Sequence, residues 1–510
     1  MHRPPRRTRI PSWRLAAALA MLVGVAALLG AAFAQDPAPQ HGGSVTVAIA
    51  ADPPGWDPSA STSQEIPRVV YHNVFEGLVR FDADGSIVPA LAESWTTSDD
   101  GLTWTFTLRQ GVKFHDGTDL TVDDVVAKFE RAKDPESGHT HPEYYAAIES
   151  IAAPDATTVV FTLAQPSRSL LYNLARPDSV VYPAAKAETQ RSEPVGTGPF
   201  RFASYTPGTE VVLERFEDYY LDGVPYLDRV VFRIISDANT RFAALQAGDV
   251  DMMGLIPEQY VQTTTMPDLK VTQGTATAEI TMALNNTRPP LDDVRVRQAI
   301  NLAIDKQSIV QGAMFGLGTI IGTHMTPAES YYIDLTDTYP YDPERARELL
   351  AEAGYPDGFT VKFELPEPYN IERRSGEVIA QQLRAVGIQA ELSVVEWGTW
   401  IQRIFLGGDY DMTIIGHSEP RDINVYGNPE YYYHYDNPRV RELLAEAEAA
   451  PTAEAETAAY QEIARIIAND AVNVWVFSPP FLMAAKQDVY GFWTDQPTPA
   501  IDMTGVYRAP

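Results

Sequence analysis

The sequence 108-LRQGVKFHDGTDLTVDDVVAKFERA-132 joins a strand pattern to a helical pattern through a short polar turn. Asp116-Gly117 predicts the turn, because Gly tolerates positive φ and Asp favours turn positions. Thr121 can then cap a helix that has Asp124 at its third position, where a carboxylate accepts free backbone N–H groups. The stretch therefore predicts a strand, a turn and a capped helix.

The charged side chains of this stretch do not form a catalytic arrangement. Apolar residues repeat at helical spacing and predict one buried face: Val122, Val125, Val126 and Phe129. Asp123 and Lys128 fall off that face, where we expect a structural role or contact with water, and His115 has no partner at helix spacing. We interpret this cluster as structural and expect no chemistry from it.

Outward from this stretch, strand and helix patterns alternate along most of the chain. Apolar runs predict strands at 44–50, 103–108, 159–163, 205–215, 230–235, 388–395 and 471–477. Helical spacing predicts helices at 66–79, 239–247, 292–315, 343–353, 375–386, 438–449 and 453–468. The interleaving predicts an α/β fold, and the hairpin-rich stretch 81–195 predicts a separate lobe. A chain of 510 residues also exceeds one ordinary core, so we expect two or three lobes.

Residues 1–34 have the features of a secretory signal peptide. Five Arg precede an apolar run from Leu15 to Leu29, and Ala32-Phe33-Ala34 matches a cleavage site. The apolar run is short for a membrane span, so we favour cleavage over a retained anchor. Arg6-Arg7 keeps the twin-arginine route open beside general secretion. The sequence has no Cys, which excludes disulfides and a lipidated Cys. We expect a periplasmic protein that is neither lipidated nor membrane-spanning.

The mature chain is strongly acidic. Removing residues 1–34 takes away five Arg and no acid, which leaves 34 basic and 68 acidic residues and a formal charge of −34. This balance argues against a nucleic-acid partner, because phosphate binding needs a basic surface. We interpret the excess of acid as a source of solubility, and a preference for a cationic ligand is the alternative.

Motifs for catalysis, metals and phosphate are incomplete in this sequence. The run 416–420, Gly-His-Ser-Glu-Pro, lacks the final Gly of a nucleophile elbow, and no His-Glu-x-x-His occurs. Gly196-x-Gly198 is followed by a strand pattern, whereas a phosphate loop continues with Lys-Ser/Thr and a helix. His139 and His141 have no third ligand nearby and are predicted to lie in a solvated loop. We expect no enzyme activity, no cofactor and no metal site.

Five separated segments resemble one protein family. The segment GVKFHDGTDLTVDDVVAKFER at 111–131 resembles a signature of the bacterial extracellular solute-binding proteins of family 5, the periplasmic peptide, dipeptide, oligopeptide and nickel receptors of ABC importers. The other segments are VGTGPFRF at 195–202, DVRVRQAINLAIDKQSIVQGAMF at 293–315, YDPERARELLAEAGYPDGF at 341–359 and GDYDMTIIG at 408–416. They follow the family's order between about residues 43 and 485.

The resemblance implies a periplasmic-binding-protein-like α/β fold of class II, cluster C type, with two lobes joined by hinge strands and an extra lobe from the N-terminal half. We expect lobe I at 35–80, 195–282 and 485–510, lobe II at 81–194 and lobe III at 283–484. The implied function is capture of a peptide or similar solute by hinge closure, followed by delivery to ABC permease subunits in the inner membrane. We expect a monomer.

The resemblance also directs attention to a ligand site in the C-terminal half, where the chain has aromatic residues and polar groups that can form a cleft. The candidates are Trp56, Glu367, Tyr369, Trp397, Trp400, His417, Glu419, Asp422 and Asn424. In peptide-binding relatives an Asp near 416–424 pairs with the ligand's ammonium group, a role that here falls to Glu419 or Asp422. Trp56 is a candidate wall residue and equally a candidate core residue.

Glu367 departs from the family pattern. Dipeptide-binding relatives have an Arg before Pro-Tyr-Asn, where it holds the ligand's carboxylate, whereas residues 367–370 of this chain are Glu-Pro-Tyr-Asn. Like charges repel, so dipeptide binding in that mode is disfavoured. A longer peptide held by its backbone, or a cationic or neutral solute, fits better, and Arg421 is an alternative partner for an acidic group. Opines, oligosaccharides and metal complexes are other ligands in the family. A secreted hydrolase and a chaperone-like binder are the rival classes.

Overall fold

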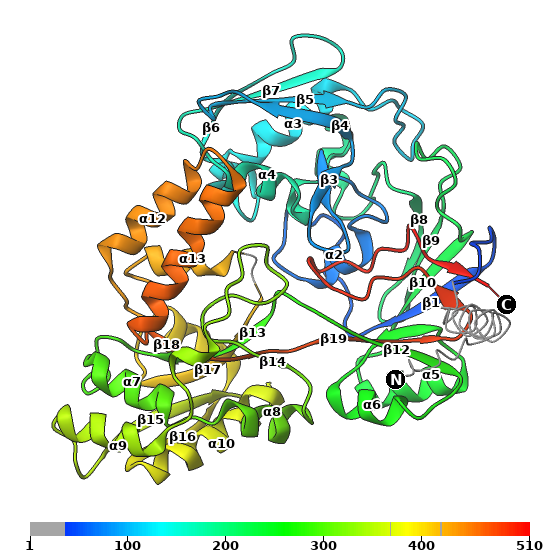
Figure 1. The fold of residues 1–510 in the computed structure, drawn as a ribbon. Coiled ribbons are helices and arrows are strands. Elements are labelled where there is room, and N and C mark those ends of the chain that lie inside the picture. Colours follow the sequence, from blue (N-terminus) through cyan, green and yellow to red (C-terminus); the bar gives the residue numbers. More distant parts are fainter. Residues whose placement is uncertain (1–35, 368, 419–420, 510) are drawn as a thin grey trace, which may run out of the picture.

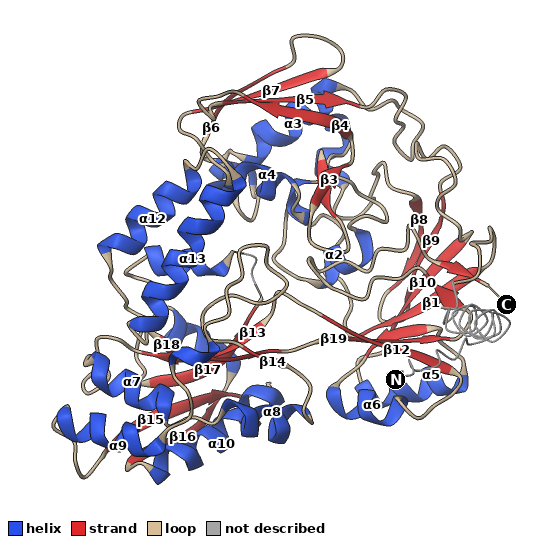
Figure 2. Ribbon diagram, in the orientation of Figure 1, coloured by secondary structure: helices blue, strands red, loops and turns tan. Residues whose placement is uncertain are grey.

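The chain, described by a computed structural model over residues 36–367, 369–418 and 421–509, is built around three larger sheets (Figures 1 and 2). We call the parts around the seven-, four- and six-stranded sheets lobe I, lobe II and lobe III. Lobes I and III are joined by two crossing segments, and lobe II is inserted from the N-terminal half. The predicted class, α/β of the periplasmic-binding-protein type with hinge strands and an extra lobe, is confirmed.

Lobe I holds a mixed sheet in which β1 runs parallel to both of its neighbours, β10 and β11. In sheet order the strands are β12 (Leu269–Gly274), β19 (Phe481–Lys486), β11 (Met252–Gly254), β1 (Ser44–Ile49), β10 (Arg229–Ile234), β9 (Glu210–Arg215) and β8 (Phe200–Thr206). Helices α5 (Ala238–Ala247) and α6 (Pro257–Thr263) lie beside this sheet (Figure 1). Val45 and Val47 of β1 are fully buried in the main core of this lobe.

Lobe II is a small antiparallel sheet with one main helix. In sheet order its strands are β4 (Ala92–Thr97), β5 (Thr103–Leu108), β7 (Thr158–Leu163) and β6 (Ile148–Ala152). Alternate residues of β5 and β7 are buried, as their sequence pattern predicts. Helix α3 (Val122–Ala132) packs against them, and α4 (Ser169–Leu174) follows later in the chain. The hairpin of β2 (Val79–Phe81) and β3 (Ile87–Pro89) precedes the sheet.

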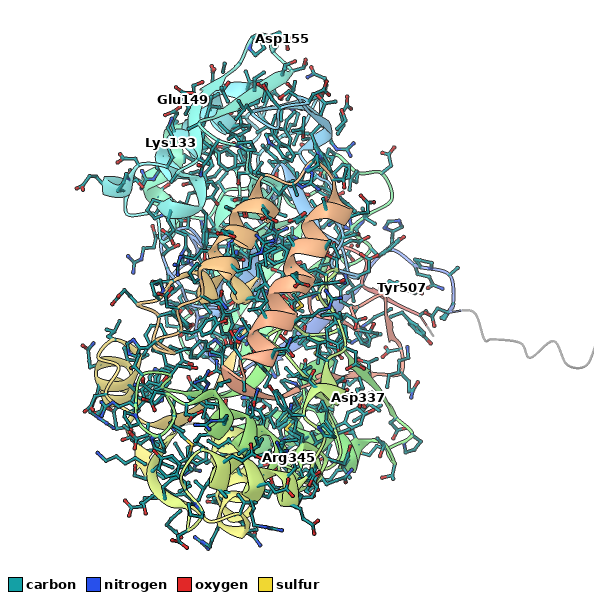
Figure 3. The ribbon with its side chains drawn as sticks, turned by 60° about the vertical axis from the view of Figure 1, so that its left-hand side comes forward. Lys133, Glu149, Asp155, Asp337, Arg345 and Tyr507 are labelled. Carbon is teal, nitrogen blue, oxygen red and sulfur yellow. The ribbon has the colours of Figure 1, made fainter. Side chains whose placement is uncertain are left out.

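Lobe III is a six-stranded sheet covered by helices. In sheet order its strands are β14 (Thr319–Ile320), β18 (Asn473–Ser478), β13 (Glu279–Leu284), β17 (Met412–His417), β15 (Phe359–Pro366) and β16 (Ile388–Val395). One core joins it to α7 (Val294–Leu302), α8 (Lys306–Met314), α9 (Pro343–Glu352) and α10 (Asn370–Ala385). A second core holds α12 (Pro438–Glu448) and α13 (Ala453–Asn469). Figure 3 shows these two helices between lobe II, marked by Lys133 and Asp155, and lobe III, marked by Arg345.

Two short segments carry the chain between lobes I and III. The outward crossing follows Gly274, the end of β12, and leads to Glu279, the start of β13. The return crossing follows Ser478 and leads to β19 through a Pro-Pro pair at 479–480. The two crossings lie side by side, because the Ser478 hydroxyl donates a hydrogen bond of 2.8 Å to the carbonyl of Ala278. Lobe III is thus attached to lobe I through a narrow, paired connection.

Three predicted elements end earlier or divide in the structure. The helix predicted at 66–79 covers only α2 (Glu65–Val70), because His72 takes φ of +67° and turns the chain. The strand predicted at 205–215 is the end of β8 and all of β9, separated by a turn that contains Gly208 at φ +68°. The helix predicted at 292–315 divides into α7 and α8, since the Asp305 carboxylate caps a new helix by accepting from the Ser308 N–H.

The stretch 108–132 has the predicted strand, turn and capped helix. Gly117 takes φ of +85°, and the Asp124 carboxylate accepts hydrogen bonds from the Thr121 N–H and hydroxyl. Lys128 differs from the prediction that it points to water: it is 2% exposed, and its ammonium lies 5.1 Å from the centre of the Tyr182 ring. The long aliphatic stem lets Lys128 pack inward while its charge meets an aromatic face.

Candidate functional site

Two cavities lie where the lobes meet. The larger, about 650 Å³, is bounded by lobe II, the loop 327–331 and helix α13. The smaller, about 120 Å³, is bounded by residues 58–67 of lobe I, residues 176–178 of lobe II and Ser418 of lobe III. Phe81 borders both cavities, so they are neighbours in the same inter-lobe region.

The walls of the larger cavity are aromatic, with a few charged groups. Its aromatic lining residues are Phe81, Trp95, Trp104, Tyr172 and Tyr331. Glu329 also lines the cavity, accepts a 2.7 Å hydrogen bond from the Thr326 N–H, and has its pKa raised to about 7 by burial. This composition is typical of a small-molecule site, in which apolar walls surround a few fixed polar groups.

Ser418 lines the smaller cavity and Arg421 the larger one. The Arg421 guanidinium is 2.8 Å from the Glu456 carboxylate and lies over the Tyr172 ring at 4.7 Å from its centre. Arg421 therefore bridges lobe III to lobe II and does not face solvent. Glu419, a predicted site residue, lies outside the described residues.

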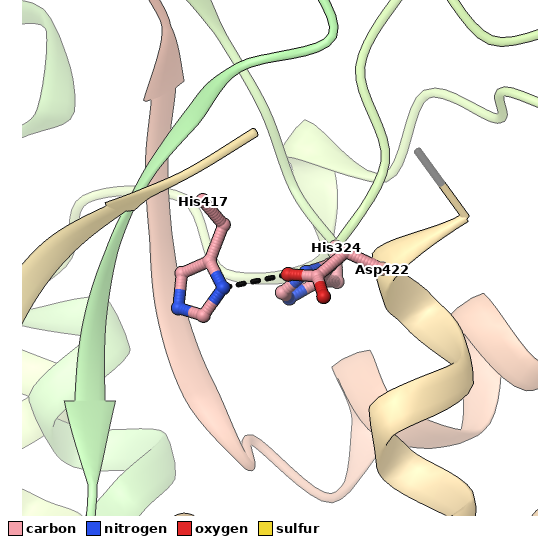
Figure 4. A group of neighbouring side chains, drawn as sticks. All are labelled: His324, His417 and Asp422. Carbon is pink, nitrogen blue, oxygen red and sulfur yellow. Dashed lines mark hydrogen bonds and ion pairs between the residues drawn. The ribbon is translucent and has the colours of Figure 1, made fainter. Parts of the chain in front are cut away.

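In lobe III, the side chains of two histidines and one aspartate meet at a single carboxylate oxygen (Figure 4). The Asp422 Oδ2 atom is 2.6 Å from His417 Nδ1 and 2.9 Å from His324 Nε2. His417 ends β17, His324 lies in the loop after β14, and Asp422 begins a 3₁₀ turn at Asp422–Gly427. The two imidazoles hold the pKa of the Asp422 carboxyl well below its usual range, although burial opposes this effect.

Both histidines have further partners on the far side of their rings. His417 Nε2 is 3.0 Å from the Tyr432 hydroxyl and 2.9 Å from the Tyr433 hydroxyl. His324 Nδ1 lies 3.1 Å from the Glu279 carboxylate and 3.0 Å from the Tyr426 hydroxyl. Burial lowers the pKa of His324 and raises that of Glu279 well above its usual range. The arrangement is therefore a buried polar network that links His417, Asp422, His324 and Glu279.

An aromatic row extends from this network along lobe III. The ring of Trp397 stacks on Trp400, with centres 5.0 Å apart, and its edge meets Tyr369 at the same distance. Trp400 is 3% exposed, contacts Tyr432 edge-on, and donates its indole N–H to the Thr413 hydroxyl at 2.9 Å. Since Tyr432 contacts His417, four predicted site residues are linked to Asp422 through side-chain contacts: Tyr369, Trp397, Trp400 and His417.

The remaining predicted site residues lie apart from this row. Trp56 is 3% exposed and packs against Phe202 and Tyr205 in the core of lobe I, in accord with the second of its two alternatives. Glu367 is exposed in the turn after β15, and Asn424 is exposed in the 3₁₀ turn that begins at Asp422. None of these three borders the two inter-lobe cavities.

No pattern in the sequence points to His324 and Glu279, because their partners come from distant parts of the chain. His139 was also misplaced by the prediction of a solvated loop: it is 9% exposed, its Nε2 lies 3.2 Å from the Asp178 carbonyl, and burial lowers its pKa to about 4. His141 instead pairs with Glu143 at 3.0 Å.

Residues 86–439 match the family model for bacterial extracellular solute-binding proteins, family 5, middle region, which is more than half of the chain. The chain belongs to this family. The glutathione-binding protein GsiB of Escherichia coli (strain K12) is 34% identical over 361 residues, which are 69% of this chain and 70% of GsiB. The homologues are solute-binding proteins and not enzymes. Family membership makes this chain the substrate-binding component of an ABC importer.

Solved structures of relatives have the same fold. AgaA of A. tumefaciens R10, in complex with agropinic acid, is 29% identical and matches 92% of this chain and 99% of its own with a TM-score of 0.75. The periplasmic binding protein DppA of Helicobacter pylori, in complex with the peptide STSA, is 26% identical and matches 92% and 99% with a TM-score of 0.77. In the described part of this chain, no helix is both long and apolar enough to cross a membrane.

Proposed function

We propose that this family 5 protein captures a peptide or a similar small solute in the periplasm and delivers it to permease subunits in the inner membrane. The larger inter-lobe cavity carries the proposal, because its lining comes from opposite lobes. A solute held there touches both lobes at once and stabilises their closed arrangement. Opening about the paired crossings would separate the walls and release the solute.

The ligand contacts are part of the proposal. Arg421 and Glu456 supply charges of both signs at the larger cavity, and they suit a zwitterionic or peptide-like solute. Asp422 is proposed as the group that pairs with an ammonium, with Glu419 as its alternative. Because Asp422 Oδ2 is taken by two imidazoles, Oδ1 is the atom we assign to that contact.

A non-peptide solute is the second candidate. Glu367 is exposed and borders neither cavity, so it bears on the choice for a solute that extends beyond them, where its carboxylate would repel the carboxylate of a dipeptide and attract a cationic group. AgaA, a relative of similar length, is seen with agropinic acid. We further propose that the chain acts by binding alone, that residues 1–34 are cleaved without lipidation, and that the mature protein is a monomer.

Mass spectrometry of solutes that co-purify with the protein is the first test, followed by calorimetric titration with the compounds found. A dipeptide, a tetrapeptide, glutathione, an opine and a polyamine complete the panel. We expect saturable binding of at least one peptide-like solute and a decrease in the radius of gyration by small-angle scattering. Replacing Trp95 with Ala should weaken binding roughly tenfold or more, because an aromatic wall is lost.

Tyr341→Ala is the matched control, since Tyr341 is 53% exposed on lobe III and lines neither cavity. Equal affinities of the Trp95→Ala and Tyr341→Ala variants would move the site away from the larger cavity. Tight dipeptide binding that persists in Glu367→Ala would overturn the argument from Glu367. Conversion of a bound solute into product would overturn binding without catalysis.

A further inference from the structure

We propose that His324, His417 and Asp422 form a binding site for one divalent transition-metal ion, Zn²⁺ by chemical type. The inference goes beyond the proposed function, because it concerns a resident ion and not the transported solute. It revises the expectation of no metal site, which rested on motifs of adjacent residues. His417 and Asp422 are five residues apart in one predicted ligand tract, and His324 joins them from a distant loop that no sequence pattern connected with them.

The geometry of the three donor atoms carries the proposal. His324 Nε2, His417 Nδ1 and one Asp422 oxygen all lie within 4.8 Å of one another. Zinc takes imidazole nitrogen and carboxylate oxygen at about 2.0–2.2 Å, which puts tetrahedral donors about 3.3 Å apart. The present spacings of 2.6 and 2.9 Å at Asp422 Oδ2 are shorter. A movement of the Asp422 carboxylate by less than about 1 Å would lengthen both contacts to that spacing, and the two ring nitrogens already lie within 4.8 Å of each other.

The outer nitrogens of both rings have the partners that metal-bound histidines need. A histidine that binds metal through one nitrogen carries its proton on the other and donates it to a carboxylate or another acceptor. His324 Nδ1 faces the Glu279 carboxylate at 3.1 Å, and His417 Nε2 faces the Tyr432 hydroxyl at 3.0 Å. The Trp475 indole N–H lies 3.3 Å from His324 Nδ1 and 3.1 Å from the Tyr426 hydroxyl, which accepts it when Nδ1 carries the proton. These contacts orient both rings so that Nε2 of His324 and Nδ1 of His417 point at the same place.

Burial and charge give independent support. The side chains of His324, His417 and Asp422 are only 2%, 10% and 12% exposed. Glu279 is 2% exposed, and its Oε2 atom has no hydrogen-bond partner among the described residues. An ionised carboxylate buried in this network is costly without a compensating charge. One divalent cation between Asp422 and His324 would compensate the charge of the Asp422 carboxylate.

The donor set selects the class of ion. Two imidazoles and one carboxylate suit Zn²⁺ and its neighbours among the transition metals, whereas Ca²⁺ and Mg²⁺ prefer oxygen ligands alone. Three protein donors leave a fourth position for water or for a donor atom of another molecule. Ser418, which follows His417 directly, borders the smaller cavity.

Calorimetric titration of the EDTA-treated, full mature protein with ZnCl₂ is the test. We expect one equivalent of Zn²⁺ per chain, with no competition from equal concentrations of Ca²⁺ or Mg²⁺. Asp422→Asn and His417→Ala should each lower the affinity by roughly 100-fold or more, and Glu279→Gln, which changes only an outer contact, by about 10- to 100-fold. His41→Gln is the matched control and should bind as the wild type does, since His41 is exposed and far from the site in the chain.

Unchanged zinc affinity in both Asp422→Asn and His417→Ala, or no saturable binding by the wild type, would overturn the proposal. Circular dichroism and urea unfolding show whether each variant is folded. If the buried substitutions prevent folding, anomalous diffraction at the zinc edge from wild-type crystals decides instead. A peak between His324, His417 and Asp422 supports the site, and a peak elsewhere refutes it. Solute binding that is unaffected by EDTA would leave the proposed function intact, so the two proposals fail separately.

Discussion

At the scale of single residues, His115 shows how a group that resembles a catalyst can be structural. Its Nε2 lies 2.9 Å from the Gly198 carbonyl, and its Nδ1 accepts a 3.3 Å hydrogen bond from the Gly196 N–H. His115 thus ties segment 111–131 to segment 195–202, the first two of the five segments that resemble the family. Gly is required at 196 and 198, because an added Cβ would lie 2.0 and 2.5 Å from the carbonyl oxygens of Val74 and Asn73.

The neutral state of His115 leads to a prediction about pH. Burial lowers its pKa from 6.5 to about 4 in the folded chain, so the unfolded chain binds more protons between these values. The free energy of unfolding should therefore fall as the pH decreases from 6.5 to 4. The loss of stability caused by His115 alone should be roughly 2 kcal/mol at pH 4.5. Urea unfolding of wild type and His115→Gln across this range measures the effect.

The His115→Gln variant should lose less stability on acidification than the wild type does. His139→Gln provides a second, separate case, because burial lowers the pKa of His139 to about 4 as well. Parallel pH profiles for the wild type and both variants would contradict the prediction.

The types of residue in the sequence indicated one part of the side-chain network in lobe III and not the other. The aromatic row at Tyr369, Trp397 and Trp400 could be proposed because aromatic residues cluster in the sequence. His324 and Glu279 could not be found, since their relation to Asp422 arises only when three segments of lobe III meet. Arg421 could be named as a charged group, but its pairing with Glu456 depends on the packing of α13.

At the scale of elements, the apolar patterns of the sequence predicted whether a segment is a helix or a strand better than they predicted the residues at which it begins and ends. Nearly all predicted strands and helices exist, because apolar periodicity reports which face is buried. The errors fall where one residue changes the backbone direction, as His72 does after α2 and Asp305 does before α8. Positive φ at a non-glycine residue has no reliable local signature, so such ends are set by tertiary contacts.

The cap of helix α3 gives a prediction at this scale. Asp124 accepts hydrogen bonds from the Thr121 N–H at 3.0 Å and from the Ala184 N–H at 2.9 Å. Asp124→Ala should lower the free energy of unfolding by about 1–2 kcal/mol, because both backbone groups lose their partner. Asp123→Ala is the matched control: Asp123 is exposed in the same helical turn and should matter by only a few tenths of a kcal/mol.

Urea unfolding at constant pH measures both variants of α3. Equal stabilities of Asp124→Ala and Asp123→Ala would show that the cap contributes nothing beyond the helix dipole.

At the scale of the whole molecule, polar contacts join lobes II and III. The Glu448 carboxylate of lobe III accepts a 2.9 Å hydrogen bond from the Ser167 hydroxyl of lobe II, and Glu456 forms an ion pair with Arg168 of lobe II at 3.4 Å. Helices α12 and α13 bring these acids to lobe II (Figure 3). The contacts cross the inter-lobe region that must open if lobe III turns about the paired crossings.

Weakening the contact of Glu456 with lobe II should increase the fraction of molecules in which lobes II and III are apart. Glu456→Gln removes the ion pair with Arg168 across the two lobes, worth up to about 1 kcal/mol, and should favour the open arrangement. The apparent affinity for the co-purified solute should fall by about 2- to 5-fold, because fewer molecules are ready to bind. Glu454→Gln, an exposed change at the start of the same helix, is the matched control.

Calorimetry gives the affinity, and small-angle scattering of the solute-free protein gives the radius of gyration. A Glu456→Gln variant with wild-type values of both would show that this contact does not govern closure.

Both ends of the described chain belong to lobe I. The Tyr507 hydroxyl donates to the Pro37 carbonyl at 2.8 Å, and the Arg508 side chain donates to the Ser44 carbonyl at 2.8 Å. Lobe III, in contrast, offers the exposed turn at Pro356-Asp357 between α9 and β15. A fluorescent protein fused to the end of the chain in lobe I and a second one inserted into that turn of lobe III would be attached to different lobes, so the distance between them would change when the lobes move. The efficiency of energy transfer between the two fluorescent proteins would then report binding of the solute, which makes the fusion an optical sensor.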